Sequence, residues 1–121
     1  MALNPTTYVK KRTPRPVPVA TLTGSADAID ISIGDIFVIN RSGAVNATTL
    51  ADPNSYSDDG REIWIKNGTT QANTITIANG LGGSGTGYTT LTFTNVAAAN
   101  VTLRAHNGSW HMVGQHLITV T

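Results

Sequence analysis

Residues 101–112 read VTLRAHNGSWHM, and this stretch decides the fold class. Its Asn107-Gly108 dipeptide favours a type I′ turn, because both central residues of that turn need a positive φ. The pairs expected across the resulting hairpin are His106 with Ser109, Ala105 with Trp110, Arg104 with His111, and Leu103 with Met112. Apolar side chains then share one face and polar side chains the other, because alternate residues of a strand point to opposite sides. A shift of one residue would mix the two sets, so the sequence predicts an antiparallel hairpin in this register.

The same alternation recurs upstream of the hairpin. Strands are expected over residues 29–33, 36–39, 62–66, 74–77 and 90–94, and the first hairpin strand begins at residue 101. Turn-forming groups separate these strands: Asp52-Pro53, Asp58-Asp59-Gly60, Asn67-Gly68 and Asn79-Gly80. Short alternating strands with frequent turns are typical of all-β folds. The sequence therefore predicts an antiparallel β-sandwich or β-barrel, jelly-roll-like, with an extended N-terminal arm. Residues 96–99 could form a helical turn, too short to change this class.

The arm is set apart by its charge and its prolines. Residues 1–19 contain Lys10, Lys11, Arg12 and Arg15 and no acidic residue, whereas residues 20–121 hold four basic residues and all seven acidic ones. Four of the five prolines also lie here, at positions 5, 14, 16 and 18. Alternate prolines exclude helix and favour extended, polyproline-like backbone. We expect residues 1–19 to form a basic arm that lies across a partner, and residues 20–121 to form a single β domain.

Composition excludes several classes of protein. The 121 residues include nineteen Thr, ten Asn and twelve Gly, and only 12% are charged, about half the usual share. Without cysteine there is no disulfide, no thiolate nucleophile and no cysteine-bearing zinc site. No apolar run is long enough for a signal peptide or a membrane span, so neither is expected.

Two motifs invite a ligand, and neither has the expected context. Residues 80–85, GLGGSG, match the glycine pattern of a dinucleotide fold, but the alternating residues 88–94 predict a strand where that fold needs a helix. His106 and His111 are diagonal neighbours on the polar face of the hairpin, with no acidic residue nearby in sequence, and His116 follows. We interpret them as surface histidines and expect no metal site and no cofactor.

No catalytic set emerges from the sequence. No serine lies in a strand-to-helix elbow, and the single glutamate excludes a Glu pair for glycoside hydrolysis. The chain is therefore not expected to be an enzyme. The cluster Lys10-Lys11-Arg12 raises the question of nucleic-acid binding, but four basic residues on a mildly acidic body make a weak footprint. Nucleic acid is not the expected partner.

Two stretches resemble a β-module found in structural proteins of tailed bacteriophages. The first, residues 47–80, includes GREIWIKNG and TITI, and the second, residues 91–114, ends in HNGSWHMVG. The matched signature residues are Gly60, Arg61, Ile63, Ile65, Lys66 and Asn67, then Asn107, Gly108, Ser109, Trp110 and Gly114. The resemblance covers somewhat more than half of the chain. It implies a trimeric, β-structured virion component, of the kind used in capsid decoration proteins, head fibres and tail fibres.

The absence of a shaft or a separate tip domain favours one of these roles. A decoration, or cement, protein needs only one compact trimerising domain and a means of gripping the capsid. We therefore expect a homotrimer made in the host cytoplasm that binds the major capsid protein on the virion exterior. The residues expected to contact the capsid are Tyr8, Lys10, Lys11, Arg12, Arg15 and Pro16 of the arm.

Trp64 and Tyr88 are candidates for the subunit interface. Trp64 is out of phase with Ile63 and Ile65, so it should lie on the polar side of its strand, where a large amphipathic ring is readily buried by another subunit. The alternative hypothesis is a tail-fibre or head-fibre module that binds a receptor or glycan, in which Tyr56, Trp64 and Tyr88 should share one exposed face.

Overall fold

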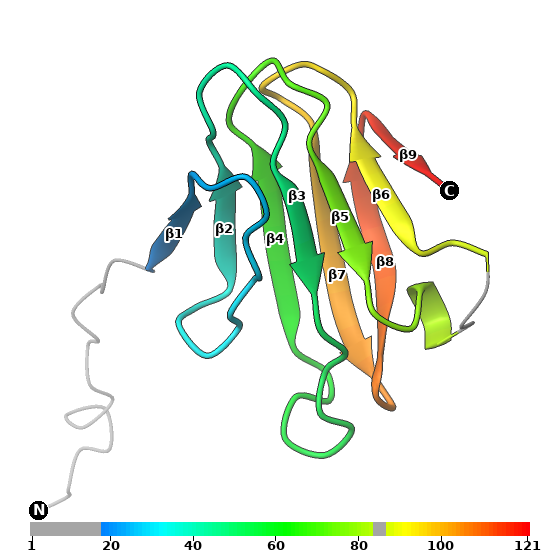
Figure 1. Cartoon of the computed structure of the whole chain (residues 1–121). Helices are drawn as coiled ribbons and strands as arrows, with labels where there is room; N and C mark the ends of the chain where they lie inside the picture. Colours follow the sequence, from blue (N-terminus) through cyan, green and yellow to red (C-terminus); the bar gives the residue numbers. More distant parts are fainter. Residues whose placement is uncertain (1–17, 84–86) are drawn as a thin grey trace, which may run out of the picture.

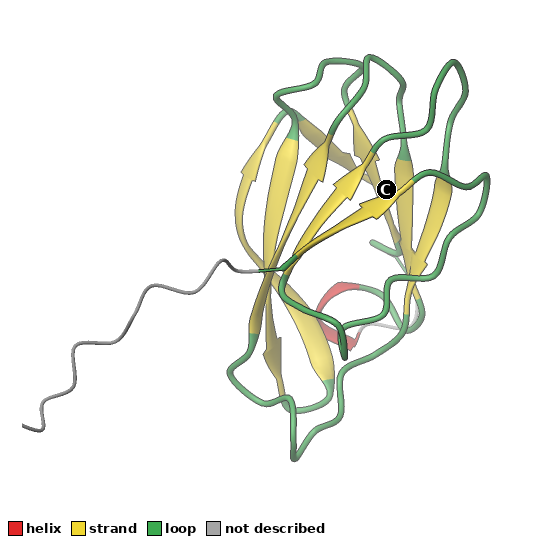
Figure 2. Cartoon of the chain, turned by 90° about the vertical axis from the view of Figure 1, so that its left-hand side faces the viewer, coloured by secondary structure: helices red, strands yellow, loops and turns green. Residues whose placement is uncertain are grey.

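Two β-sheets pack face to face and enclose the apolar core (Figure 1). The computed structural model describes residues 18–83 and 87–121. Within these ranges the strands are β1 Val19–Leu22, β2 Ile36–Ile39, β3 Ala47–Leu50, β4 Glu62–Asn67, β5 Thr74–Ile77, β6 Thr90–Phe93, β7 Asn100–His106, β8 Ser109–His116 and β9 Ile118–Val120. A short 3-10 helix, η2, covers Leu81–Gly83. Figure 2 shows the sheets as two layers joined by loops. The predicted all-β sandwich is confirmed.

The sheets are mixed, whereas the sequence predicted antiparallel pairing throughout. One sheet has the order β1-β2-β4-β7-β8 and the other has the order β3-β5-β6-β9. The pairs β1–β2, β2–β4 and β3–β5 are parallel, and the remaining pairs are antiparallel. The cause is the path of the chain from β2 to β5, which alternates between the sheets and reverses direction at each crossing (Figure 1). β2 and β4, and likewise β3 and β5, therefore become parallel neighbours. β1 and β2 are consecutive but parallel, because the connection between them passes β3 of the other sheet before β2 begins.

The hairpin that opened the sequence analysis has the predicted register. Strands β7 and β8 pair His106 with Ser109, Ala105 with Trp110, Arg104 with His111, and Leu103 with Met112. Asn107 has φ 52° and Gly108 has φ 79°, as a type I′ turn requires. Leu103, Ala105 and Trp110 are buried, and Met112 packs against the core from its edge. The two-sided sorting of the hairpin is therefore confirmed.

One predicted strand is wrong. Residues 29–33 form no strand: an isolated bridge joins Ala28, just before them, to Thr49 of β3. The chain turns at residues 30–33, and Ile33 is 54% exposed. The Asp30 carboxylate accepts hydrogen bonds from the Ser32 backbone N–H at 2.9 Å and from the Ser32 hydroxyl at 2.6 Å. These local bonds offer the backbone an alternative to a sheet ladder and reverse the chain. Strands β1, β3 and β9 were not among the predicted strands; they pair with β2, β5 and β6, respectively.

Every strand from β2 to β8 contributes buried apolar side chains to the core. The largest fully buried ones are Trp110, Phe37, Phe93, Ile39, Leu50, Ile63, Ile65, Ile75, Ile77, Leu91, Leu103 and Val101. In β5, β6 and β7 these inward positions alternate with outward polar residues, as the sequence pattern requires, whereas β2 and β4 also direct Ile36, Val38 and Trp64 outward. Among the described residues, no helix has the length and apolar character needed to cross a membrane.

Strand β1 begins at Val19, one residue before the predicted start of the β domain. It lies at the edge of the five-stranded sheet, so the described chain enters the sandwich at that edge (Figure 1). The predicted capsid-contacting residues Tyr8, Lys10, Lys11, Arg12, Arg15 and Pro16 lie outside the described residues.

Candidate functional site

The candidate site lies on the outer face of the five-stranded sheet, around Trp64. In β4, Ile63 and Ile65 are buried and Trp64 between them faces away from the core, as predicted. The pairing registers place Trp64 beside Ile36 of β2 on one side and beside Thr102 of β7 on the other. Ile36 in turn pairs with Val19 of β1, which is 54% exposed. We call Val19, Ile36, Trp64 and Thr102 the outer row.

The Trp64 indole is held in place at its polar edge. Its Nε1–H donates to the Asn100 side-chain oxygen at 3.2 Å, and the Asn100 amide donates to the Ala98 carbonyl at 2.9 Å. The Trp64 backbone N–H donates to the Asp35 carbonyl at 2.8 Å. With these bonds made within the chain, the ring offers a contacting partner an apolar surface of fixed orientation.

A shallow hollow of about 490 Å³, widely open to solvent, lies beside this ring. It is lined by Asp35, Ile36, Glu62, Ile63, Trp64 and Thr102. Its two acidic residues are each held by an arginine: Arg61 Nε lies 2.8 Å from Asp35 Oδ1, and Arg104 Nε lies 2.8 Å from Glu62 Oε2. Both pairs are at the surface, where an ion pair contributes little stability. Their effect is to fix one oxygen of each carboxylate at the rim of an apolar hollow.

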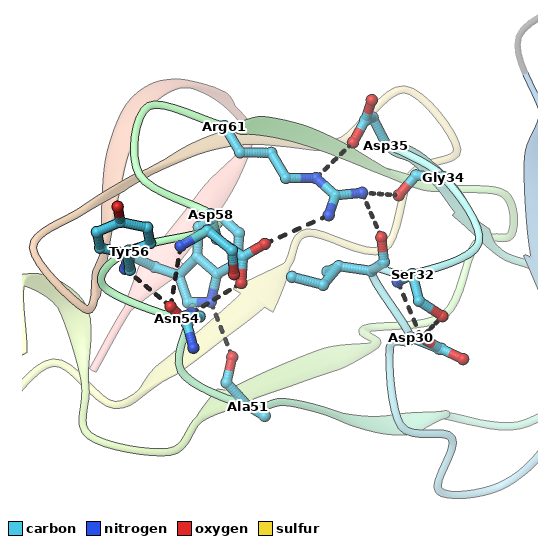
Figure 3. Close-up of polar contacts among 12 residues, drawn as sticks. Asp30, Ser32, Gly34, Asp35, Ala51, Asn54, Tyr56, Asp58 and Arg61 are labelled. Carbon is cyan, nitrogen blue, oxygen red and sulfur yellow. Dashed lines mark hydrogen bonds and ion pairs between the residues drawn. The ribbon is translucent and has the colours of Figure 1, made fainter.

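Arg61 also organises the loops at this end of the sandwich (Figure 3). Its guanidinium donates to the Gly34 carbonyl at 3.0 Å and to the Ile31 carbonyl, and its Nη1 lies 3.6 Å from Asp58 Oδ1. One side chain therefore joins the β1–β2 connection to the β3–β4 loop. The Asp35 wall of the hollow is fixed by this cluster.

The β3–β4 loop presents Tyr56 to solvent. Asn54 Oδ1 accepts the backbone N–H of Tyr56 at 2.8 Å and that of Ser57 at 2.9 Å, and Asp58 accepts the N–H of Asn54 at 2.8 Å. These bonds form a tight turn, and the Tyr56 side chain is 93% exposed on it (Figure 3). The ring is thus carried on a backbone whose conformation is already set.

The structure does not bring the three predicted aromatic residues together. Trp64 lies on the five-stranded sheet, Tyr56 lies in the β3–β4 loop, and Tyr88 precedes β6 of the other sheet with 62% of its surface exposed. The single exposed aromatic face expected for a glycan-binding module is therefore not formed by these side chains.

The histidines form a pair rather than a cluster. The rings of His106 and His111 have centroids 5.9 Å apart, and His106 Nδ1 lies 3.5 Å from Asp59 Oδ1. In the part of the chain that the structure describes, no three metal-binding side chains come together.

Sequence reasoning found Trp64 but missed its neighbours. Ile36 and Val19 reach it only through the parallel pairing of β1, β2 and β4, which residue alternation does not reveal. Arg61, directly before β4, follows Asp58 closely in sequence, but its contact with Asp35, 26 residues upstream, had no local signal.

No family model and no curated protein matches this chain. Its function is therefore argued from the outer row, the hollow and the arm.

The turn at Asp30 yields a direct test of the local geometry. Hydrogen bonds from the Ser32 hydroxyl and backbone N–H lower the pKa of Asp30 below its ordinary value of 3.8. We expect Ser32→Ala to raise this pKa towards 3.8, measured by NMR titration of the side-chain carbonyl carbon. Because the folded-state pKa is depressed, the stabilising effect of the turn is present above pH 3.8 and is lost as pH falls through the lower pKa. An unchanged pKa would contradict the bond; Ser42→Ala, in another exposed loop, is the control.

Proposed function

We propose that the chain is a capsid decoration protein of a tailed bacteriophage, which assembles as a homotrimer and stabilises the shell from outside. The observation that carries the proposal is the position of the outer row and its hollow beside the edge at which the basic arm joins the domain. One end of the sandwich thus combines a surface suited to another subunit with a segment suited to a distant partner.

The subunit contact is assigned to the face around Trp64. Partly exposed Trp64 and Ile36, with exposed Val19, form an apolar band across three strands of the sheet. Aromatic and apolar side chains are enriched in the buried centres of protein interfaces, and charged side chains are depleted there. A chain with only 12% charged residues has a surface of this kind to bury. Tyr88 belongs to a different sheet and would contact a neighbour only through a second surface.

The capsid contact is assigned to the arm. Tyr8, Lys10, Lys11, Arg12, Arg15 and Pro16 lie in a segment without acidic residues, which suits an acidic surface on the major capsid protein. Prolines limit the conformations of the free chain and so reduce the entropy lost when it binds. Three arms on one trimer would also strengthen a weak individual contact through avidity.

Deleting residues 2–16 should abolish capsid binding while leaving the domain folded. We expect the apparent affinity for shells of the cognate major capsid protein to fall by a factor of about 100 or more, because three anchoring contacts are lost together. Co-sedimentation at physiological salt measures this, and circular dichroism checks the fold. A second variant, in which Lys10, Lys11, Arg12 and Arg15 are all replaced by Gln, keeps the length of the arm and removes its charge. It shows whether capsid binding depends on the charge of the arm or on its length. Unchanged binding of the deleted chain would show that the arm is not the anchor.

The oligomeric state supplies an independent check. Light scattering should give a mass three times the 12.7 kDa of one chain. A monomer at micromolar concentration would contradict both the decoration and the fibre hypotheses.

The alternative is a receptor- or glycan-binding module of a tail or head fibre. One observation favours it: Tyr56 is almost fully exposed on a turn held by Asn54 and Asp58. A glycan array separates the two proposals. Binding that disappears in Tyr56→Ala would support the fibre module, and an array without hits would remove it.

A further inference from the structure

We infer that the hollow beside Trp64 receives the proline-rich base of the arm, residues 14–17, from a neighbouring copy of this chain. Pro18 stays on its own subunit, where it lies beside Gly34. This inference rests on the proposed trimer and names the contact that closes it. Under this inference, Arg15 and Pro16 contact the neighbouring subunit and not the capsid. The residues that contact the capsid are then Tyr8, Lys10, Lys11 and Arg12.

The chemistry of the hollow matches that of the segment. Residues 14–17 read PRPV and Pro18 follows them, so proline stands at alternate positions, which favours polyproline II backbone. Such segments bind grooves lined by aromatic side chains, because the backbone is already extended and loses little entropy. Here the fixed Trp64 indole and Ile36 provide the apolar wall.

Arg15 supplies the charge that fits the rim of the hollow. Asp35 Oδ1 and Glu62 Oε2 are already engaged by arginines, but Asp35 Oδ2 and Glu62 Oε1 have no hydrogen bond to any described residue. Their side chains are 53% and 42% exposed, respectively. A guanidinium can bond to such oxygens without breaking the existing pairs.

Geometry favours a neighbour's arm over the chain's own. Trp64 lies two strand spacings from β1, about 10 Å across the sheet. To cover it, the chain's own arm would have to turn sharply over the sheet immediately before Val19. Prolines at 14, 16 and 18 oppose that turn, because each fixes its own φ and disfavours helical backbone at the residue before it. At about 3.1 Å per residue, a polyproline II segment of four residues would span roughly 12 Å, which suits a contact with a neighbouring subunit.

A contact between two different surfaces of the same chain has a consequence for assembly. If the arm base of one copy occupies the hollow of the next, the interface is heterologous, and a ring forms when the rotation closes. In a closed ring of three copies, each hollow is occupied by the arm base of a neighbour, and no arm base is left unbound. The same arrangement would bury Val19 and Trp64 of each copy.

Paramagnetic relaxation in the full chain tests this contact. The chain has no cysteine, so Thr13→Cys provides a single attachment point for a nitroxide label. Labelled chain without nitrogen-15 is mixed with unlabelled nitrogen-15 chain, unfolded together and refolded. We expect loss of the Trp64 indole N–H signal and the Thr102 amide signal in the mixed trimers. The control label at Ser42 lies in the β2–β3 loop, beyond the other end of β2, and should leave both signals intact.

Two results would overturn the inference. Broadening that occurs only when label and nitrogen-15 are on the same chain would place the arm base on its own hollow. An absence of broadening in both samples would show that the hollow does not bind this segment. As a second check, replacing Pro14 and Pro16 together by Gly should lower the trimer fraction, and a trimer fraction equal to that of the unaltered chain would count against the inference.

The failure of this inference is distinguishable from that of the proposed function. Loss of capsid binding on arm deletion without broadening would leave the decoration role and remove the hollow contact. Broadening between chains that bind no capsid would leave the contact and remove the decoration role.

Discussion

Trp110→Ala is expected to lower the free energy of unfolding by about 3–5 kcal/mol, a large part of the stability of a domain of this size. Trp110 is the largest of the fully buried side chains, and it projects from β8 between the two sheets. Alanine would leave a cavity that the surrounding β-strands cannot close. The change would also deprive the Ala51 carbonyl of the indole N–H that it accepts at 2.9 Å. Urea unfolding followed by circular dichroism measures the loss.

The chain contains its own matched control, because it has only two tryptophans. Trp64 has the same side chain on the outer face, so Trp64→Ala creates no internal cavity and should cost no more than about 1 kcal/mol. Trp110→Phe keeps most of the buried volume and removes the hydrogen bond, which isolates a cost of about 1–3 kcal/mol. Equal losses for the two alanine variants would contradict the assignment of Trp110 to the core.

Residue alternation predicted the faces of the strands but not their neighbours. The hairpin of β7 and β8 was predictable to single-residue register, because the φ requirements of Asn107 and Gly108 are local. The parallel pairing of β2 with β4 depends on β3 crossing to the other sheet between them, and no local pattern encodes that crossing. The predicted position of Trp64 was therefore right, while its contact with Ile36 could not be foreseen.

Local side-chain hydrogen bonds explain the one segment in which residue alternation predicted a strand wrongly. Residues 29–33 alternate as regularly as β5 does, yet the bonds from Ser32 to Asp30 make them a turn. The spacing of an aspartate two residues before a serine was the available signal. Residue alternation alone does not show whether the backbone forms hydrogen bonds to such side chains or to a neighbouring β-strand.

The structural role of three asparagines could not be predicted from the sequence. In so polar a chain its asparagines suggest turns and surface positions. The structure instead buries Asn46, Asn67 and Asn73 completely. The Asn73 side-chain oxygen accepts the Asn46 backbone N–H at 2.7 Å, and the Asn73 amide donates to Asn67 Oδ1 at 2.7 Å. These three residues come from separate segments, so their contact depends on the whole fold.

Asn67→Ala is expected to destabilise the domain by about 3–5 kcal/mol, because several buried polar groups lose their partners and each costs about 1–3 kcal/mol. The Asn67 amide donates to the carbonyls of Gln71 at 2.9 Å, Val96 at 3.1 Å and Thr94 at 3.4 Å. Its carbonyl oxygen accepts from Asn73. One side chain thus ties the end of β4 to the β6–β7 loop. Thermal and urea unfolding measure the loss.

Two further variants show whether the amide itself carries this stability. Asn79→Ala removes an exposed amide that meets Asp52, and it should cost less than about 1 kcal/mol. Asn67→Asp keeps the shape but places a carboxylate against backbone carbonyls, so burial and repulsion should raise its pKa in the folded state. Its destabilisation should therefore be smaller at pH 4 than at pH 7, because a raised folded-state pKa favours folding when the group is protonated. A loss for Asn67→Ala no larger than that for Asn79→Ala would mean that packing, not the buried amide, holds these loops together.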